Sequence, residues 1–466
     1  MTVPAESQQI TLLVEHLRQR IREVLPQVRL DLERLVRIPS VSAPAFDQAR
    51  VQDSAAAVAE LLRGAGLRDV TTLSAELDGR PGAPAVVGHR PAPAGAPTVM
   101  LYAHHDVQPP GPEAGWLSPP FEPTERDGRL YGRGAADDKA GVMAHVAALR
   151  ALGDDLGVGV VVFVEGEEEI GSPTFGEFLH AYRERLAADV IVVADSVNWR
   201  VGVPALTSTL RGLVDGTITV RTLDHAVHSG MYGGPVPDAM LATVRLLDSF
   251  WDADGTLAIK GLTVAEGEDL EYSEADLRAD AGLLDGVELI GTGRLTARMW
   301  TRPALTIIGI DAPTVDQASN TLAHEIRVKF SLRIAPGQDP QAALAAIRDH
   351  VGARAPFGAQ VEVTPGETGQ PFAADVAGPV YETARWALEQ AWGTAPVQTG
   401  IGGSIPFIAD LVKVYPEATV LITGVEDPDS RAHGVNESLH LGEFERACLA
   451  EALLLAALAR TPEATR

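Results

Sequence analysis

Histidine and acidic residues directly follow several short apolar runs in this sequence. The first run, residues 99–103, is closed by His104, His105 and Asp106. Such a run is typical of a buried strand that ends at a sheet edge, where open α/β sheets place their chemistry. Residues two apart on a strand share one face, so His104 and Asp106 should point the same way. A carboxylate beside an imidazole usually supports a metal-binding histidine, although a histidine satisfied by hydrogen bonds at a strand end explains this fragment equally well.

Three further stretches repeat this arrangement of an apolar segment followed by acidic residues. Asp137 follows a short strand signal, Glu168 and Glu169 follow a continuous apolar run, and Asp195 follows another. Asp137 and Asp138 also precede an apolar helix, so capping of that helix is the alternative explanation for them. Four such endings would gather many negative charges at one edge of one sheet. Crowded carboxylates repel one another, and a bound divalent cation is the simplest relief.

The composition is that of a globular chain of two or three domains. Of its 466 residues, 45% are apolar and 22% are charged. The net charge, 38 − 63 = −25, makes nucleic acid and anionic membranes poor partners, because phosphate binding needs an excess of Lys and Arg. Cys448 is the only cysteine, so any metal site must use His, Asp and Glu. With no signal-like N-terminus and no run near the roughly 20 apolar residues of a membrane span, we expect a cytoplasmic protein.

Helical spacing of apolar residues is clearest near the two ends of the chain. It predicts helices over residues 8–36, 380–392 and 441–459, and Pro26 is expected to kink or break the first of them. Residues 252–304 are acidic and carry only weak helical signals.

The pattern of elements changes in the middle of the chain. Residues 213–223 and 326–334 alternate between apolar and polar, as antiparallel strands with one wet face do. Helical stretches lie between and after them. We therefore predict a small α+β module over residues 213–373, inserted in a larger domain formed by residues 1–212 and 374–466.

The motifs that carry these residues resemble those of the carnosinase-type family of dinuclear zinc dipeptidases, which also includes aminoacylases and succinyl-diaminopimelate desuccinylases. In chain order they are YAHHDVQP, LYGRGAADDKAG, EGEEEIGS, LRG, HSGMYGG, FSLRIAP, GGSIP and AHGVNE. The resemblance covers nearly the whole chain and is strongest to the dipeptidase branch. It implies a mixed-sheet α/β catalytic domain of zinc-peptidase type with an inserted α+β lid and dimerisation domain, and hence a homodimer.

The resemblance also implies two divalent metal ions per subunit. His104 and Asp195 would bind one ion, Glu169 and His433 would bind the other, and Asp137 would bridge both. Nitrogen and oxygen ligands of this kind suit Zn²⁺ first, with Mn²⁺ or Co²⁺ as alternatives.

Other residues of the same motifs would act beside the metal ions. Glu168 would be the general base, which takes a proton from a water that bridges the two ions and later gives it to the leaving amine. Asp106 would support His104 from behind and belongs to the implied catalytic set. The resemblance further implies a cis peptide bond between Asp137 and Asp138.

Four residues would contact the substrate. His228 would reach the active site of the partner subunit and stabilise the oxyanion, which makes it both a catalytic and a substrate-binding candidate. Arg333 would hold the substrate's terminal carboxylate through a bidentate pair. Asn320 and Ser404 stand where the family contacts its substrate. For all four residues, a purely structural role is the alternative.

Two departures from the family pattern leave the substrate preference open. Gly400 and Ile401 stand where the dipeptidase branch usually has Arg-Glu, and residues 321–324 replace the usual Ile-Pro. We expect a metal-dependent dipeptidase that acts on a small peptide. The alternatives are a hydrolase of N-acyl amino acids and a non-catalytic assembly protein of the same fold, and the latter should have lost ligands or the base.

Overall fold

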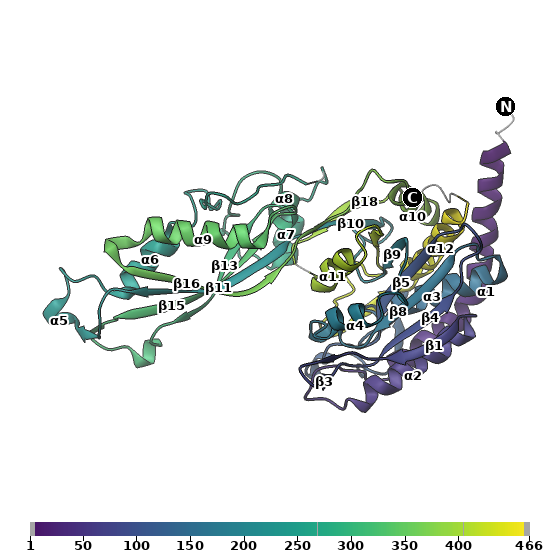
Figure 1. Cartoon of the computed structure of the whole chain (residues 1–466), viewed down its shortest axis with the longest axis horizontal. Helices are drawn as coiled ribbons and strands as arrows, with labels where there is room; N and C mark the ends of the chain where they lie inside the picture. Colours follow the sequence, from purple (N-terminus) through teal and green to yellow (C-terminus); the bar gives the residue numbers. More distant parts are fainter. Residues whose placement is uncertain (1–4, 268, 404, 461–466) are drawn as a thin grey trace. The chain divides into compact units, whose positions relative to one another are not determined.

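A computed structural model describes residues 5–267, 269–403 and 405–460 of the chain (Figure 1). The chain divides into two compact units. The larger unit consists of Met1–Ser208, Ala374–Gln398 and Asp410–Arg466, and the smaller unit consists of Thr209–Ala373 and Thr399–Ala409.

A six-stranded mixed sheet forms the centre of the larger unit, with the strand order β1–β4–β8–β5–β9–β19. Strands β8, β5, β9 and β19 run parallel, whereas β4 pairs antiparallel with β8 on one side and with the edge strand β1 on the other. The expected mixed α/β fold is therefore confirmed. The strands are Arg68–Leu73 (β1), Ala85–Arg90 (β4), Gly159–Glu165 (β8), Thr98–His104 (β5), Val190–Val193 (β9) and Thr419–Ile422 (β19).

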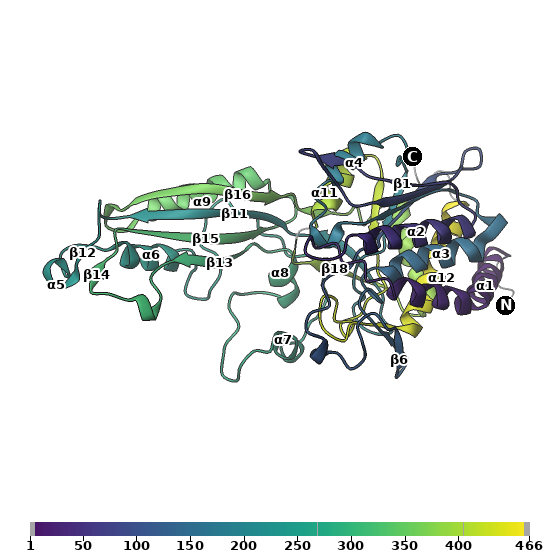
Figure 2. The ribbon, with the colours of Figure 1, turned by 90° about the horizontal axis from the view of Figure 1, so that it is seen from below.

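Helices cover both faces of this sheet (Figures 1 and 2). Val99, Leu101 and Ala103 of β5 face a core that they share with five helices on one side. Those helices are α1 (Ala5–Val36), α2 (Ala49–Gly64), α3 (Lys139–Leu152), α10 (Pro379–Trp392) and α12 (Leu441–Leu458). On the other face, Tyr102 lies edge-on to Phe175 of α4 (Phe175–Ala181), with ring centroids 6.2 Å apart. This two-sided cover explains why β5 and β8 are apolar along almost their whole length.

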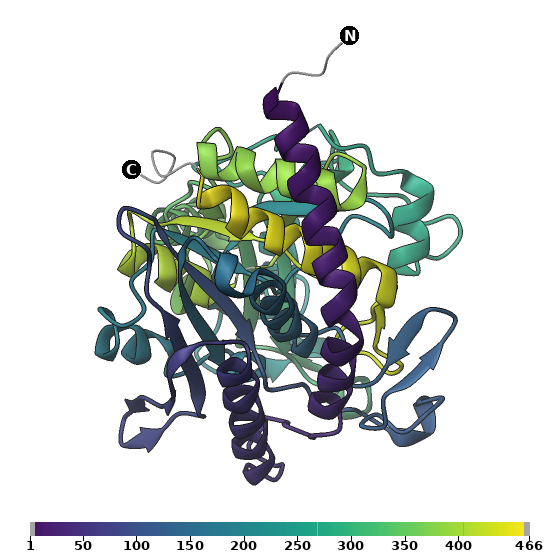
Figure 3. The ribbon, with the colours of Figure 1, turned by 90° about the vertical axis from the view of Figure 1, so that its right-hand side faces the viewer.

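Helix α1 is continuous over 32 residues and passes through Pro26 without ending there. Ile21 and Val28, seven residues apart on either side of the proline, are both buried in the core. Figure 3 shows α1 in purple crossing α12 in yellow on this face. Because the apolar stripe continues past Pro26, packing against the neighbouring helices outweighs the missing backbone hydrogen bond.

His145 fixes helix α3 against the strand that ends in His104. Its Nδ1 lies 2.8 Å from a carboxylate oxygen of Glu451 on α12, and its Nε2 lies 3.0 Å from the carbonyl oxygen of Tyr102. Burial opposes a charged ring, but Glu451 raises the pKa of His145 overall. Since both ring nitrogens face acceptors, the side chain is held as an imidazolium that ties α3, α12 and β5 together.

The strand signal before Asp137 does not belong to the central sheet. It forms β7 (Arg129–Tyr131), which pairs with β6 (Thr124–Arg126) and β20 (Ser438–His440) in a separate three-stranded sheet. The expectation that four strand ends share one sheet edge is therefore wrong for Asp137. Residues 132–138 leave β7 as a loop and lead into α3.

An antiparallel sheet with the order β13–β15–β11–β16 forms the smaller unit. Alternate residues of β15, among them Val328 and Phe330, are buried against helices on one face of the sheet. This alternation is the two-residue period expected of a one-sided strand. The elements are β13 (Ala304–Asp311), β15 (Glu325–Ile334), β11 (Gly212–Arg221), β16 (Gln360–Gly369), α6 (Ala239–Asp248) and α9 (Pro340–Arg354).

The remaining elements are short, and β17, β10 and β18 form a three-stranded sheet of their own. They include β2 (Glu76–Leu77), β3 (Arg80–Pro81), β10 (Ala205–Leu210), β12 (Val227–His228), α5 (Ser229–Tyr232), α7 (Glu274–Ala281), α8 (Leu295–Trp300), β14 (Thr321–Leu322), β17 (Phe372–Ala373), β18 (Val397–Ile401) and α11 (Pro406–Val414). Among the described residues, no helix combines the length and apolar character that a membrane span requires.

Candidate metal centre

The carboxyl ends of three neighbouring parallel strands carry most of the predicted ligands. Strand β5 ends at His104, Glu168 and Glu169 follow β8 in the 3₁₀ turn Glu168–Ile170, and Asp195 follows β9. The pairing of β5 with both β8 and β9 sets these ends side by side. They therefore meet at the sheet edge where α/β folds place their sites.

Asp137 reaches the same place from the loop before α3. Its Oδ1 lies 3.1 Å from Nε2 of His104, and its Oδ2 lies 3.0 Å from Nε2 of His433. The peptide bond from Asp137 to Asp138 is cis, as the resemblance implied. One carboxylate thus faces two histidines through its two different oxygens, which is the arrangement that a ligand bridging two ions needs.

The other predicted ligands surround this carboxylate. Nε2 of His433 lies 3.1 Å from Oε2 of Glu169, and Nε2 of His104 lies 3.9 Å from Oδ2 of Asp195. The His433 side chain is 59% exposed, so the centre is open to solvent on that side. Among the residues that the structure describes, two groups have ligand atoms that all lie within 4.8 Å of one another: His104, Asp137 and Glu169, and His104, Glu168 and Asp195.

Acidic side chains are crowded together in this centre. Burial raises the pKa of Glu168 to about 9, with His104 opposing the shift and Asp195 adding to it. Burial likewise raises the pKa of Asp195 to about 7. Conversely, hydrogen bonds from His104 and His433 outweigh the burial of Asp137 and lower its pKa. Crowded carboxylates of this kind are relieved by a divalent cation, and imidazole nitrogens with carboxylate oxygens form a donor set that Zn²⁺, Mn²⁺ and Co²⁺ accept.

Asp106 connects the histidine to the acidic turn. Nδ1 of His104 lies 3.4 Å from Oδ1 of Asp106 and 3.2 Å from its carbonyl oxygen. The same carboxylate accepts hydrogen bonds from the backbone N–H groups of Glu168, at 3.2 Å, and Glu169, at 3.1 Å. Asp106 therefore orients the ring of His104 and the backbone of both glutamates at once.

Asp138 caps the helix that follows it. Its Oδ1 accepts a hydrogen bond from the backbone N–H of Gly141 at 3.2 Å, and its Oδ2 accepts one from the backbone N–H of His104 at 3.1 Å. The capping explanation thus holds for Asp138, and the cap also joins α3 to the end of β5.

Two further residues hold the ligands and were not singled out from the sequence. The buried carboxylate of Glu437 accepts hydrogen bonds from the backbone N–H groups of Gly134, Ala136 and Asp137 at 2.9–3.1 Å. Gln108 donates from its backbone N–H to Oε1 of Glu169 at 3.0 Å. Both residues stand in motifs of the sequence, because Glu437 closes AHGVNE and Gln108 belongs to YAHHDVQP. The position of each residue in its motif does not indicate which group it contacts.

Three of the predicted substrate residues, His228, Asn320 and Arg333, lie in the smaller unit. His228 is exposed at the end of β12 opposite Thr321 of β14, and the backbone N–H of Ser229 donates to the carbonyl oxygen of Asn320. His228 and Asn320 therefore lie close together. Arg333 is half-buried near the far end of β15, whose ten residues span roughly 30 Å. Ser404, the fourth candidate, lies outside the described residues.

The departure at Gly400 has a local physical reason within the smaller unit. A Cβ atom at Gly400 would lie 2.5 Å from Oγ1 of Thr209 and 2.7 Å from Cβ of Trp300 on α8. A side chain at this position would therefore collide with its neighbours. The larger residue that the dipeptidase branch carries here does not fit beside Trp300.

Glu165, at the end of β8, gives the stability of the protein a pH dependence. It is 3% exposed, it accepts a hydrogen bond of 2.6 Å from the Tyr102 hydroxyl, and burial raises its pKa from 4.5 to about 8. The folded state therefore holds a proton that the unfolded state releases above pH 4.5. This contribution to the free energy of unfolding falls as the pH rises from about 4.5 to about 8, by at most about 5 kcal/mol. Glu165→Gln should remove the loss, so the variant should gain stability over the wild type across this range, as measured by denaturant unfolding at pH 5 and pH 8.

The matched control for this prediction is Glu177→Gln, because Glu177 is exposed on α4. Its unfolding curve should follow that of the wild type at both pH values. Parallel pH dependences of Glu165→Gln and the wild type would contradict the prediction.

The fold and the cluster of imidazoles and carboxylates define a metal-dependent hydrolase. The chain belongs to the peptidase family M20/M25/M40, whose model matches residues 100–457, and it is a metallopeptidase of that family. The family and enzyme class expected from the motifs are thereby confirmed.

Two curated relatives and one solved structure illustrate the similarity. The chain is 40% identical over 379 residues to the cysteinylglycine-S-conjugate dipeptidase of Corynebacterium striatum. This alignment covers 79% of this chain and 83% of that protein. The chain is 32% identical over 368 residues to the Beta-Ala-His dipeptidase of Rattus norvegicus, with 74% and 73% covered. The crystal structure of human carnosine dipeptidase 1 superposes with a TM-score of 0.74 at 25% identity, covering 96% of this chain and 99% of that chain.

Proposed function

We propose that this chain is a dipeptidase that works with two divalent metal ions. Zn²⁺ is the preferred ion, and Mn²⁺ and Co²⁺ are the alternatives. The observation that carries the proposal is the position of Asp137, whose two oxygens each lie about 3 Å from a different histidine. His104 and Asp195 would hold one ion, and Glu169 and His433 the other. The dipeptidase names of similar proteins in a bacterium and a mammal support the reaction.

Glu168 acts as the general base in this proposal. The bound ions would polarise the peptide carbonyl and lower the pKa of water. The carboxylate of Glu168 takes a proton from the attacking water and delivers it to the leaving amine. Asp106 keeps Glu168 in place, because it accepts a hydrogen bond from the backbone N–H of Glu168 while it also supports His104.

The substrate residues support a homodimer. Arg333 would pair with the free carboxylate of the dipeptide, and His228 would stabilise the oxyanion. Because His228 and Asn320 lie at the opposite end of β15 from Arg333, one chain does not bring them to a common point. We therefore assign His228 and Asn320 to the active site of the partner subunit, and residues 213–373 to a lid and dimerisation domain. Ser404 stays a predicted substrate contact, and the cytoplasmic location stays a prediction from composition.

An activity screen of the metal-loaded protein tests this function. The panel contains dipeptides with varied side chains, the same dipeptides as carboxamides, and N-acetyl and N-succinyl amino acids. We expect hydrolysis of dipeptides with a free carboxylate, loss of activity with a chelator, and recovery with Zn²⁺ or Mn²⁺. Cleavage of the N-acyl amino acids alone would favour the acylase alternative. A purified protein that binds no metal would contradict the proposal.

A further inference from the structure

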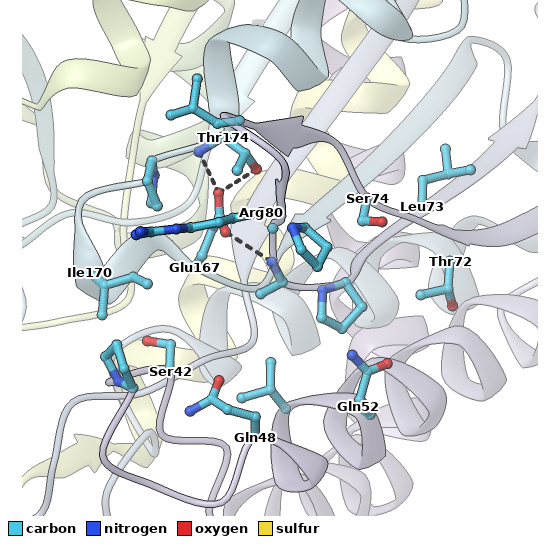
Figure 4. Close-up of a pocket in the computed structure, with 18 of the residues that line it drawn as sticks. Ser42, Gln48, Gln52, Thr72, Leu73, Ser74, Arg80, Glu167, Ile170 and Thr174 are labelled. Atoms are coloured by element: carbon cyan, nitrogen blue, oxygen red, sulfur yellow. Dashed lines mark hydrogen bonds between the residues drawn. The ribbon is translucent and has the colours of Figure 1, made fainter.

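A cavity of about 850 Å³ lies beside the turn that carries Glu168 and Glu169 (Figure 4). Glu167, Ile170 and Thr174 line one side of it, and none of its lining residues is a candidate metal ligand. Ile170 is 40% exposed, so side-chain packing does little to hold the turn on this side. The turn itself is only three residues long, and such a short 3₁₀ segment is weak when isolated.

Glu167 holds this side of the turn in place through three hydrogen bonds. Its Oε1 accepts from the backbone N–H of Thr174 at 2.7 Å and from the Thr174 hydroxyl at 2.6 Å, and its Oε2 accepts from the backbone N–H of Ala83 at 2.9 Å. Figure 4 shows all three as dashed lines. Glu167 is 5% exposed, so these bonds are shielded from water. They join the turn to the loop after β3 and to the start of α4.

The surroundings of Glu167 are shaped for this contact. A Cβ atom at Gly82 would overlap the Thr174 hydroxyl and would lie 3.0 Å from Oε2 of Glu167. Only glycine lets the loop close on the carboxylate here. All three partners donate a hydrogen, and a carboxylate accepts from all of them. A glutamine would present its NH₂ group to a backbone N–H on one side or the other and would lose at least one bond.

We propose that Glu167 is a positioning residue for the metal centre, which holds the turn so that Glu168 and Glu169 keep their places. Asp106 restrains the two glutamates from the side of β5, and Glu167 restrains the preceding backbone from the side of the cavity. The inference rests on the proposed function, in which Glu169 is a metal ligand and Glu168 is the general base. Glu167 itself touches neither the ions nor the substrate.

The test replaces Glu167 with glutamine and measures three quantities. These are the affinity for Zn²⁺ in competition with a chelator, kcat and KM for a cleaved dipeptide, and hydrogen exchange of the backbone amides over residues 166–174. We expect metal affinity or kcat to fall about 10- to 100-fold, KM to stay within about threefold, and exchange to rise locally. Glu177→Gln is the matched control and should behave like the wild type.

The variant Thr174→Val keeps the proposal testable if Glu167→Gln does not fold. It removes only the hydroxyl bond to Glu167, so we expect the same changes at about fivefold. Wild-type metal affinity, kcat and exchange in both variants would overturn the proposal. Exchange that rises throughout the larger unit would overturn it too, because that result indicates a purely structural role. Metal affinity and exchange need no substrate, so they decide this inference even if no dipeptide is cleaved.

Discussion

Replacing Glu168 with glutamine is expected to lower kcat by about 10²- to 10⁴-fold. The amide keeps the size of the side chain but cannot accept the proton of the attacking water. Metal content should stay at the wild-type level, since the proposed ligands are His104, Asp137, Glu169, Asp195 and His433. The measurement is steady-state kinetics on a cleaved dipeptide together with elemental analysis of the same preparation.

The electrostatics of the centre explain why Glu168 suits this task. Burial raises its pKa to about 9 when no cation is near. Divalent ions beside it would stabilise its charged form and bring the pKa down toward the working pH, where a general base is most effective. The geometry also permits a competing role, because Glu168, His104 and Asp195 have ligand atoms within 4.8 Å of one another.

The neighbouring variant Glu169→Gln separates these roles. It makes the same chemical change one position along, but on a side chain that lies 3.1 Å from Nε2 of His433. We expect Glu169→Gln to lose bound metal and Glu168→Gln to keep it. Loss of metal from Glu168→Gln would assign Glu168 to the ligands instead, and full activity in that variant would reject it as the base.

Local patterns of the sequence predicted the regular elements well. The alternation over residues 326–334 corresponds to β15 (Glu325–Ile334), and the apolar run over residues 157–164 corresponds to the buried β8 (Gly159–Glu165). These signals are strong because each face of the element meets one environment over its whole length. Where packing decides, a residue that often breaks helices need not end one: α1 does not break at Pro26, because its buried stripe continues past the proline.

The position of Asp137 shows what one-dimensional patterns miss. Its strand signal was genuine, yet β7 belongs to another sheet, and the loop to α3 brings the carboxylate to the ends of β5 and β8. The residue types still pointed to the right cluster, because buried carboxylates need hydrogen-bond donors, opposite charges or a metal ion beside them, and the histidines of the same motifs can provide the first two. For supporting residues such as Glu437 and Glu167, the residue type does not indicate the partner, even where the residue stands in a motif. Most of their partners are backbone N–H groups, which every sequence contains.

Replacing Asp137 with asparagine is expected to give the largest loss of activity, roughly 10³- to 10⁵-fold in kcat/KM. The reason is that the variant would lose several kcal/mol of transition-state stabilisation by the metal ions. Asparagine keeps the shape of the side chain but turns one ligand oxygen into an NH₂ group. In this chain the two oxygens face His104 at 3.1 Å and His433 at 3.0 Å, so either orientation of the amide deprives one side of its acceptor. Metal content should fall from two ions per chain to one or none.

The control is Asp154→Asn, at the exposed carboxylate just beyond the other end of α3, which should keep wild-type metal content and activity. Adding metal ions back distinguishes a site that has lost a ligand from an intact site that has only lost its ions. Wild-type protein stripped with a chelator should regain activity when Zn²⁺ or Mn²⁺ is added, whereas Asp137→Asn should not regain it at any concentration of either ion. If Asp137→Asn bound two ions and turned over dipeptides as the wild type does, Asp137 would not be the bridge. The centre would then have to be built from the outer pairs alone, His104 with Asp195 and Glu169 with His433, and such pairs give the two ions no shared ligand to hold them together.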